Sequence, residues 1–262
     1  MTIWQAIFLG IVQGLTELLP ISSSAHLALI PMIFKWDVPD AFEIALHFGT
    51  LLAIGLFFFK DWILLLKGGY ELVAKKKNTT EGKMFWYIVA ATIPGGAIGF
   101  ILDRYAEEVL TKPLIIAIAL IVMGILLYVI DKKSEAKIKY EKMNFKQTFL
   151  IGLSQALAFI PGVSRSGITM TTARFMKIDR ESAAKYSFML SAPIVLAATV
   201  FKLKDFVFSI PFILGVLSSF IVGVVVIKFL LEYLRKGSFK IFAIYRLILG
   251  IAILGLIING IL

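Results

Sequence analysis

The sequence has no cysteine and few charged residues. Without cysteine there is no disulfide and no thiolate metal site. Only 17% of the 262 residues are charged, against about a quarter in a soluble domain, while 59% are hydrophobic. Basic residues are absent before Lys35, so the first apolar segment lacks the basic flank of a cleavable signal, and we expect it to belong to the working protein. This composition excludes an ordinary soluble domain and predicts a polytopic membrane protein.

Ten apolar segments can be marked along the chain. They cover residues 4–19, 22–34, 41–59, 85–102, 113–130, 147–160, 164–176, 184–201, 207–230 and 241–261. Segments 22–34 and 164–176 are too short for a bilayer core of about 30 Å, and each follows a segment that ends in proline, Pro20 or Pro161. Because proline interrupts helical hydrogen bonding, each pair predicts a helix, a break and a short return helix. We expect an all-α, polytopic integral membrane protein, a single membrane domain over residues 1–262, with about six full transmembrane helices and two re-entrant broken-helix pairs.

The two halves of the chain resemble each other. An offset of 142 positions aligns Gly10 with Gly152, Gln13 with Gln155, Ser22 with Ser164 and Lys60 with Lys202. Each half would hold one broken pair and three full spans. Since three is odd, the second half would enter the membrane inverted, as in many transporter folds. The sequence therefore predicts inverted-topology repeats over about residues 1–143 and 144–262.

The net charge of +10 comes from basic residues between the apolar segments. The stretches 60–83, 131–146, 174–185 and 228–240, predicted to be loops, would share one side of the membrane and carry 20 Lys and Arg residues. The stretches on the opposite side carry 5. The positive-inside rule makes the first side cytoplasmic, which puts both termini outside. This distribution is typical of membrane loops, so we expect no nucleic-acid partner.

A few ionisable residues lie inside the apolar segments beside the two breaks: Glu17, His26 and Arg165. A charge at mid-bilayer costs several kcal/mol, so such residues normally face a partner or a cavity. One interpretation is a Glu17–Arg165 ion pair that only fastens the two halves together. Serine and glycine gather around these residues, however, and favour a functional site.

The starts of the two return helices have the features of an anion site. A helix N-terminus presents unpaired N–H groups and partial positive charge, and Arg165 adds a planar guanidinium suited to phosphate. If the halves pack as inverted repeats, the two helix starts meet near the midplane. The candidate phosphate-binding residues are Ser22, Ser24, Ser164, Ser166, Thr169, Gly162 and Gly167, the glycines being expected to let the backbone approach an oxyanion.

Two separated motifs, QGLTELLPISSSAH and PGVSRSGIT, together resemble the undecaprenyl-diphosphate phosphatase family, also called bacitracin-resistance proteins. The family positions are filled here by Gln13, Glu17, Ser22, Ser23, His26, Ser164, Arg165, Ser166 and Thr169. The likeness extends over essentially the whole chain. Many members have Glu where Gln13 stands, which weakens a metal role for that position.

The resemblance implies an integral membrane phosphatase (a phosphoric anhydride hydrolase) with its active site at the outer face of the plasma membrane. It would act on a polyprenyl diphosphate in the lipid bilayer, release inorganic phosphate and leave the monophosphate for reuse as a carrier in peptidoglycan and other envelope glycan synthesis. A divalent cation, Mg²⁺ or Ca²⁺, could bridge Glu17, with Gln13 as a second ligand, and the diphosphate. The sequence does not require a homodimer and does not exclude one.

We expect Ser23 to attack the terminal phosphorus, with Arg165 compensating charge. Glu17 or His26 would accept the proton, and His26 as nucleophile through a phosphohistidine stays an alternative. A lipid-carrier flippase using the same phosphate site is the rival function. We expect His47 to make an interhelical hydrogen bond outside the core site, and Arg246 to extend to the inner interface.

Overall fold

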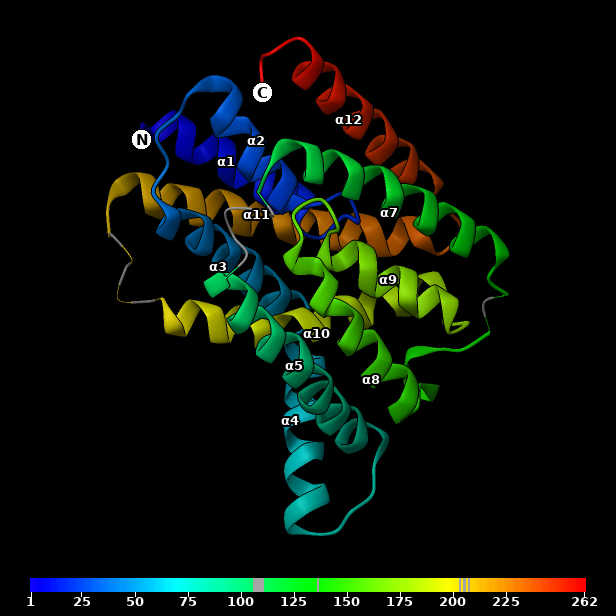
Figure 1. Cartoon of the computed structure of the whole chain (residues 1–262). Coiled ribbons are helices and arrows are strands. Elements are labelled where there is room, and N and C mark those ends of the chain that lie inside the picture. The colour runs from blue at the N-terminus through cyan, green and yellow to red at the C-terminus, as the bar shows by residue number, and fades with distance from the viewer. Residues whose placement is uncertain (106–110, 136, 203, 205, 207) are drawn as a thin grey trace.

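The computed structural model describes residues 1–105, 111–135, 137–202, 204, 206 and 208–262 (Figure 1). Within these ranges the secondary structure is helical, apart from one isolated bridge between Ile138 and Ile178. The elements are α1 (Ile3–Thr16), α2 (Ser23–Phe34), α3 (Asp40–Phe57), α4 (Phe59–Ala74), α5 (Thr80–Tyr105), α7 (Pro113–Lys133), η1 (Tyr140–Lys142), α8 (Phe145–Ser154), η2 (Gln155–Phe159), α9 (Arg165–Phe175), α10 (Arg180–Phe201), α11 (Ile210–Leu234) and α12 (Lys240–Ile258). Helices α3, α7, α10, α11 and α12 are long and apolar enough to cross a membrane. The expected all-α, polytopic membrane protein is confirmed.

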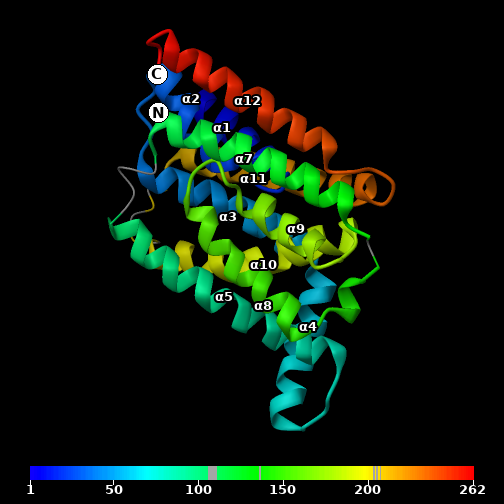
Figure 2. The same cartoon turned by 45° about the vertical axis from the view of Figure 1, so that its right-hand side comes forward.

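Each of the ten predicted apolar segments corresponds to one helix, or to α8 followed by η2. The prediction of a loop over residues 60–83 is wrong, because α4 occupies most of it. Lys67 and Glu71 interrupt the apolar run of this helix, so hydropathy does not reveal it, although Leu65 and Gly68 form a buried face. The backbones of α4 and α5 come close where Gly68 meets Gly82. The turn between these two helices projects away from the other helices (Figures 1 and 2).

The two predicted breaks have the same local structure. The chain leaves α1 after Thr16 and starts α2 at residue 23, and it leaves η2 after residue 159 and starts α9 at residue 165. The residues that cap α2 and α9 are Ser22 and Ser164, with φ of 76° and 71°. Each side chain accepts from the backbone N–H three residues on, at Ala25 and Gly167. A non-glycine residue with positive φ is uncommon, so its recurrence at an offset of 142 indicates that the breaks are built alike.

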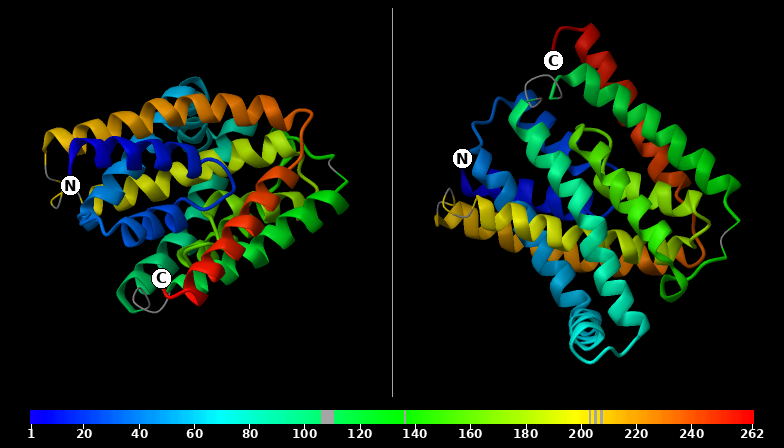
Figure 3. Two further views of the ribbon diagram at one scale, coloured as in Figure 1. Left: turned by 90° about the horizontal axis from the view of Figure 1, so that it is seen from above. Right: turned by 60° about the horizontal axis from the view of Figure 1, so that its bottom comes forward.

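The first helix of each broken pair, α1 or α8, packs against a long helix from the other half of the chain. Figure 3 shows α1 beside α11, and it also shows two unbroken helices from different halves, α7 and α12, side by side. The α1–α11 contact brings Gly10 against the backbone of Gly215, and the α8–α5 contact brings Gly152 against the backbone of Ala91. Because Gly10 and Gly152 are matched by the offset of 142, these contacts agree with a repeat. The inverted orientation of the halves and the re-entrant course of the broken helices stay predictions.

Arg246 on α12 is fully buried beneath both breaks, and the expectation that it reaches the inner interface is wrong. Its guanidinium donates to the carbonyl oxygen of Pro20 in the first break (3.1 Å) and to those of Gly162 (2.5 Å) and Val163 (2.9 Å) in the second. A fourth contact reaches the Leu120 carbonyl at 3.4 Å. The carbonyls of Pro20, Gly162 and Val163 lie in the breaks, outside regular helices, and that of Leu120 lies within α7. The buried cation therefore satisfies acceptors that the breaks leave without partners.

Candidate active site

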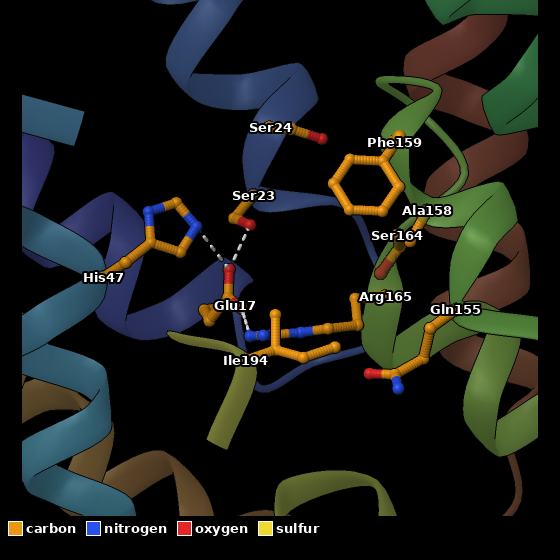
Figure 4. A pocket seen from close by; sticks show the side chains of 10 residues that line it. All are labelled: Glu17, Ser23, Ser24, His47, Gln155, Ala158, Phe159, Ser164, Arg165 and Ile194. Atoms are coloured by element: carbon orange, nitrogen blue, oxygen red, sulfur yellow. Dashed lines mark hydrogen bonds and ion pairs between the residues drawn. The ribbon is translucent and has the colours of Figure 1, made fainter. Parts of the chain in front are cut away.

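A cavity of about 160 Å³ lies where the two breaks meet (Figure 4). Its lining residues come from the end of α1, the starts of α2 and α9, and from α3, η2 and α10. They are Glu17, Ser23, Ser24, His47, Gln155, Ala158, Phe159, Ser164, Arg165 and Ile194. The cavity has room for a phosphate-sized group with water. Both halves of the chain therefore contribute to one polar pocket.

The Glu17 carboxylate is the centre of the polar contacts in this pocket. Its Oε1 accepts from the Arg165 guanidinium, and its Oε2 accepts from the Ser23 hydroxyl. The amide of Gln13, one turn earlier on α1, donates to Oε2 at 3.2 Å, and Nε2 of His47 lies 3.3 Å from the same oxygen. Figure 4 shows the His47 ring and the Ser23 hydroxyl pointing at the carboxylate from the same side. The Glu17 side chain is only 5% exposed, so these contacts replace its hydration.

The serines at the breaks join the two halves and cap the helices. Ser22 Oγ accepts from the backbone N–H of Gly162 at 3.1 Å, across the two breaks. Ser166 Oγ donates to the carbonyl oxygens of residues 17 and 19. Ser24 and Ser164 line the pocket. The Ser24 hydroxyl lies 3.2 Å from that of Ser22, and the Ser164 hydroxyl lies 3.2 Å from that of Ser166. The N-termini of α2 and α9, with their partial positive charges, thus both lie at this cavity.

The residues of the pocket can be compared with the ligands that the expected divalent cation would require. Among the residues that the structure describes, no group of three or more His, Cys, Asp or Glu side chains could hold a metal ion by itself. Gln13 Oε1 is buried without a hydrogen-bond partner, and Gln13 lies four residues, about one helical turn, before Glu17 on the same face. Mg²⁺ often takes one or two protein ligands and completes its shell with substrate phosphates and water. Glu17 and Gln13 fit that limited role and not a closed protein cage.

Comparison with known proteins gives one consistent result. The family model described as "Bacitracin resistance protein BacA" matches residues 6–252. An undecaprenyl-diphosphatase of Pelotomaculum thermopropionicum is 50% identical, covering 97% of this chain and 96% of the relative. Proteins of the same name from Caldicellulosiruptor bescii and Gemmatimonas aurantiaca are 47% and 45% identical, each with 97% of both chains covered.

The chain belongs to the BacA family. The two motifs that suggested the resemblance form the two breaks of this BacA-family protein, and the pocket lies between them. Of the residues expected from the sequence, the structure brings together Glu17, Ser23, Ser24, Ser164 and Arg165 at the cavity, with Gln13 bound to Glu17 behind it.

His26 is not among the residues that line the cavity. Its Nδ1 lies 2.6 Å from the Ser22 carbonyl oxygen, and its Nε2 lies 2.6 Å from the Tyr245 hydroxyl. The imidazole stacks against the Tyr245 ring. On a helix that starts at residue 23, residue 26 lies about 60° short of a full turn, so its side chain leaves the helix in a different direction from that of Ser23. In this BacA-family protein His26 contacts the capping turn and α12.

Three more expected phosphate ligands lie away from the lining. Thr169 Oγ1 lies 2.7 Å from both the Arg165 carbonyl oxygen and the Ser187 hydroxyl, inside the protein. A Cβ at Gly162 would meet the backbone oxygen of residue 116 on α7 at 2.6 Å, and one at Gly167 would meet Nη1 of Arg246 at 2.8 Å. The two glycines allow close packing beneath the breaks, which differs from the expected approach of the backbone to an oxyanion. Ser22 and Ser166 support the pocket from behind.

Two polar residues of the pocket were not assigned to it from the sequence. His47 does make an interhelical contact, but its partner is Glu17, so the expectation that it lies outside the core site is wrong. His47 is an ionisable residue within a membrane-spanning segment, and such a residue is by default a candidate for the functional site. Gln155 was noticed only as the repeat partner of Gln13. Its burial in the pocket depends on the change from α8 to the 3₁₀ helix η2, which the sequence pattern did not reveal.

Proposed function

We propose that this chain hydrolyses a polyprenyl diphosphate of the undecaprenyl type to the monophosphate and inorganic phosphate. The observation that carries the proposal is a serine hydroxyl that donates to a buried carboxylate, Glu17, which is ion-paired with Arg165 between two helix starts. Full-length relatives named undecaprenyl-diphosphatase support the same activity. The monophosphate would return as a lipid carrier for envelope glycan synthesis.

Binding of the diphosphate depends first on charge compensation. Several negative charges enter a pocket of low dielectric constant, where fixed positive groups act strongly. Arg165 would turn from Glu17 toward the terminal phosphate and bind two of its oxygens. The N-termini of α2 and α9 and the hydroxyls of Ser24 and Ser164 would donate to the remaining oxygens.

The reaction would proceed through Ser23. Its Oγ attacks the terminal phosphorus while its proton passes to Glu17. The bond between this phosphorus and the bridging oxygen breaks, and Glu17 passes its proton to the departing oxygen. The lipid leaves as the monophosphate, Ser23 carries a phosphoryl group, and Glu17 is again a carboxylate. Water then attacks this phosphoserine and gives one proton to Glu17. The bond between phosphorus and Ser23 Oγ breaks, inorganic phosphate leaves, and Glu17 returns the proton to Ser23 Oγ. The overall change is the addition of one water molecule.

An imidazole beside Glu17 would orient this base and exchange protons with it, and the geometry favours His47 because it contacts Glu17. The role expected for His26 as an acid or base would require its ring to leave Tyr245. A phosphohistidine at His26 would require the same movement. We therefore assign proton exchange at Glu17 to His47 and a positioning role at the start of α2 to His26.

A divalent cation, Mg²⁺ or Ca²⁺, would assist by neutralising part of the charge of the diphosphate. Glu17 and the buried Oε1 of Gln13 would be its protein ligands. Removal of divalent ions by a chelator should then lower phosphate release, and either ion should restore it. Full activity of the chelated protein would contradict this part of the proposal.

The proposed setting is the plasma membrane, with the pocket and both termini facing outward and the broken helices entering from opposite sides as inverted repeats. The charge distribution and the matching caps at Ser22 and Ser164 support this arrangement. Lipid flipping would use the same phosphate site, but the relatives named above carry a phosphatase name, so the proposal does not extend to transport.

The test is phosphate release from a long-chain polyprenyl diphosphate by the purified protein in detergent. Wild type should release phosphate, and Ser23→Ala should lower the rate by about a thousandfold or more. Ser218→Ala is the matched control, since its hydroxyl bonds only to the Leu214 carbonyl on α11. Acid quenching of a reaction labelled at the terminal phosphate should trap acid-stable phosphoserine. No release by wild type, or equal rates for Ser23→Ala, would refute the proposal.

A further inference from the structure

Gln155 is a buried glutamine in the pocket whose side chain has no partner. The residue is 2% exposed, and neither Oε1 nor Nε2 has a hydrogen bond. Among the described residues with unpartnered buried side-chain atoms, it is the one for which both ends of the amide lack a partner. A buried amide without partners destabilises the folded protein, so such a group in a cavity points to a ligand.

The local structure directs this amide into the cavity. Gln155 is the first residue of η2, where the helix tightens after α8, and it lines the same pocket as Arg165. Figure 4 shows its side chain across the pocket from Ser23 and beside Ile194, whereas the other apolar side chains of the lining, Ala158 and Phe159, lie nearer to Ser24 and Ser164.

The repeat partner explains why the amide has no protein partner. In the first half, Nε2 of Gln13 donates to Glu17, four residues later. An offset of 142 matches Gln13 to Gln155 and Glu17 to Phe159. The second half therefore keeps the glutamine but has an aromatic ring where the carboxylate would stand. The first glutamine supports the proposed base, and the second is left able to bind a ligand.

We propose that Gln155 binds the phosphate that stays on the lipid, its Nε2–H donating to an oxygen of that group. This inference rests on the proposed function and adds a residue to the substrate site. Ser23, Glu17 and Arg165 would surround the terminal phosphorus, so the second phosphate would lie farther from Ser23, toward Gln155 and Ile194. When the bridging bond breaks, negative charge grows on that second phosphate, and a fixed amide donor stabilises it. In Figure 4 the Oε1 atom points toward the cavity and Nε2 away from it, so the donation requires a half-turn of the amide about its last side-chain bond, which leaves Oε1 to accept from water.

The main test replaces Gln155 by leucine, which has a similar size and no polar atoms. With a long-chain polyprenyl diphosphate, Gln155→Leu should lower kcat/KM about ten- to a hundredfold, the effect of losing one hydrogen bond to a charged group. The unfolding temperature should stay equal or rise, because two unpartnered buried atoms are removed. Gln155→Glu should lower kcat/KM further, since its carboxylate would face the diphosphate. Ser154→Ala is the control, as the neighbouring hydroxyl bonds to the Ile151 carbonyl and does not line the pocket.

Product inhibition identifies which phosphate the amide binds. In Gln155→Leu the inhibition constant of the polyprenyl monophosphate should rise, and that of inorganic phosphate should stay unchanged. The opposite pattern would overturn the assignment to the lipid phosphate. Wild-type kinetics in Gln155→Leu, or a lower unfolding temperature that accompanies the loss, would overturn the binding role.

A failure of the proposed function can be told apart from a failure of this inference. If wild type releases no phosphate, stabilisation by inorganic pyrophosphate decides the matter without turnover. The wild-type unfolding temperature should rise with pyrophosphate, and the rise should be smaller in Gln155→Leu than in Ser154→Ala. Equal rises in the two variants, or none in wild type, would refute the role of Gln155.

Discussion

Glu17 and Arg165, which are 148 positions apart, form an ion pair across the interface between the two breaks. The pair could serve only to fasten the halves of the molecule. Glu17 also accepts from Ser23, however, and both partners line the cavity. A fastening pair needs only opposite charges, whereas a phosphate site needs the planar geometry of the guanidinium. This difference can be measured.

Arg165→Lys keeps the charge and removes the paired donors. We expect phosphate release to fall about a hundredfold or more, because an ammonium group cannot bind two phosphate oxygens in one plane. The unfolding temperature should change little, since Lys can still pair with Glu17. Full activity of Arg165→Lys would show that the pair only holds the halves together.

The two histidines should respond differently to substitution. His47→Ala removes the imidazole at Glu17, and we expect turnover to fall about a hundredfold. His26→Ala should have a smaller effect and should match Tyr245→Phe, because the two side chains are joined by a 2.6 Å contact. The loss of turnover in the double variant His26→Ala/Tyr245→Phe should also be smaller than the combined losses of the two single variants. A larger loss for His26→Ala than for His47→Ala would restore His26 as the proton-transfer group.

Much of the fold was accessible from the sequence because the bilayer imposes simple rules. Apolar length predicted the five described helices that are long and apolar enough to cross a membrane, against about six expected, and the prolines at 20 and 161 predicted the breaks. Glu17, Ser23 and Arg165 could be predicted as site residues because polar side chains at a break within the membrane are costly unless they face a partner or a cavity. His47 and Arg246 were misassigned because each lies within an apolar span, far in sequence from the break that it contacts. Such contacts depend on how the helices cross, which periodicity does not encode.

Arg246 should be a determinant of stability. It is buried and donates to carbonyl oxygens of both breaks. Arg246→Met would leave these acceptors unsatisfied, and we expect a loss of about 3 kcal/mol or more in the free energy of unfolding. Thermal unfolding in detergent checks this. Arg235→Met is the control, because its guanidinium is mostly exposed and pairs with Glu181 at the surface. Equal unfolding temperatures for the two variants would contradict the role of Arg246.

The close approach of α8 and α5 should tolerate no side chain at residue 152. A Cβ at Gly152 would overlap the backbone oxygen of Ala91, which cannot move without shifting α5. We expect Gly152→Ala to cost about 1–3 kcal/mol of unfolding free energy. Gly255→Ala on α12 meets nothing within 4 Å and should be neutral or slightly stabilising. A Gly152→Ala variant as stable as Gly255→Ala would show that the helices separate more easily than this packing implies.

The absence of cysteine allows the proposed orientation to be tested without background labelling. Asn78 lies in the turn between α4 and α5, beside Lys75 and Lys77, while Asp37 lies between α2 and α3. The positive-inside rule predicts that the first turn is cytoplasmic and the second faces outward. A thiol reagent that cannot cross membranes should therefore label Asp37→Cys in intact cells and leave Asn78→Cys unlabelled, and permeabilised cells should show both. Labelling of Asn78→Cys alone in intact cells would reverse the orientation and turn the pocket toward the cytoplasm. Labelling of both would mean that the two turns lie on the same side, so an even number of crossings separates them. The inverted repeat requires an odd number and would then be refuted.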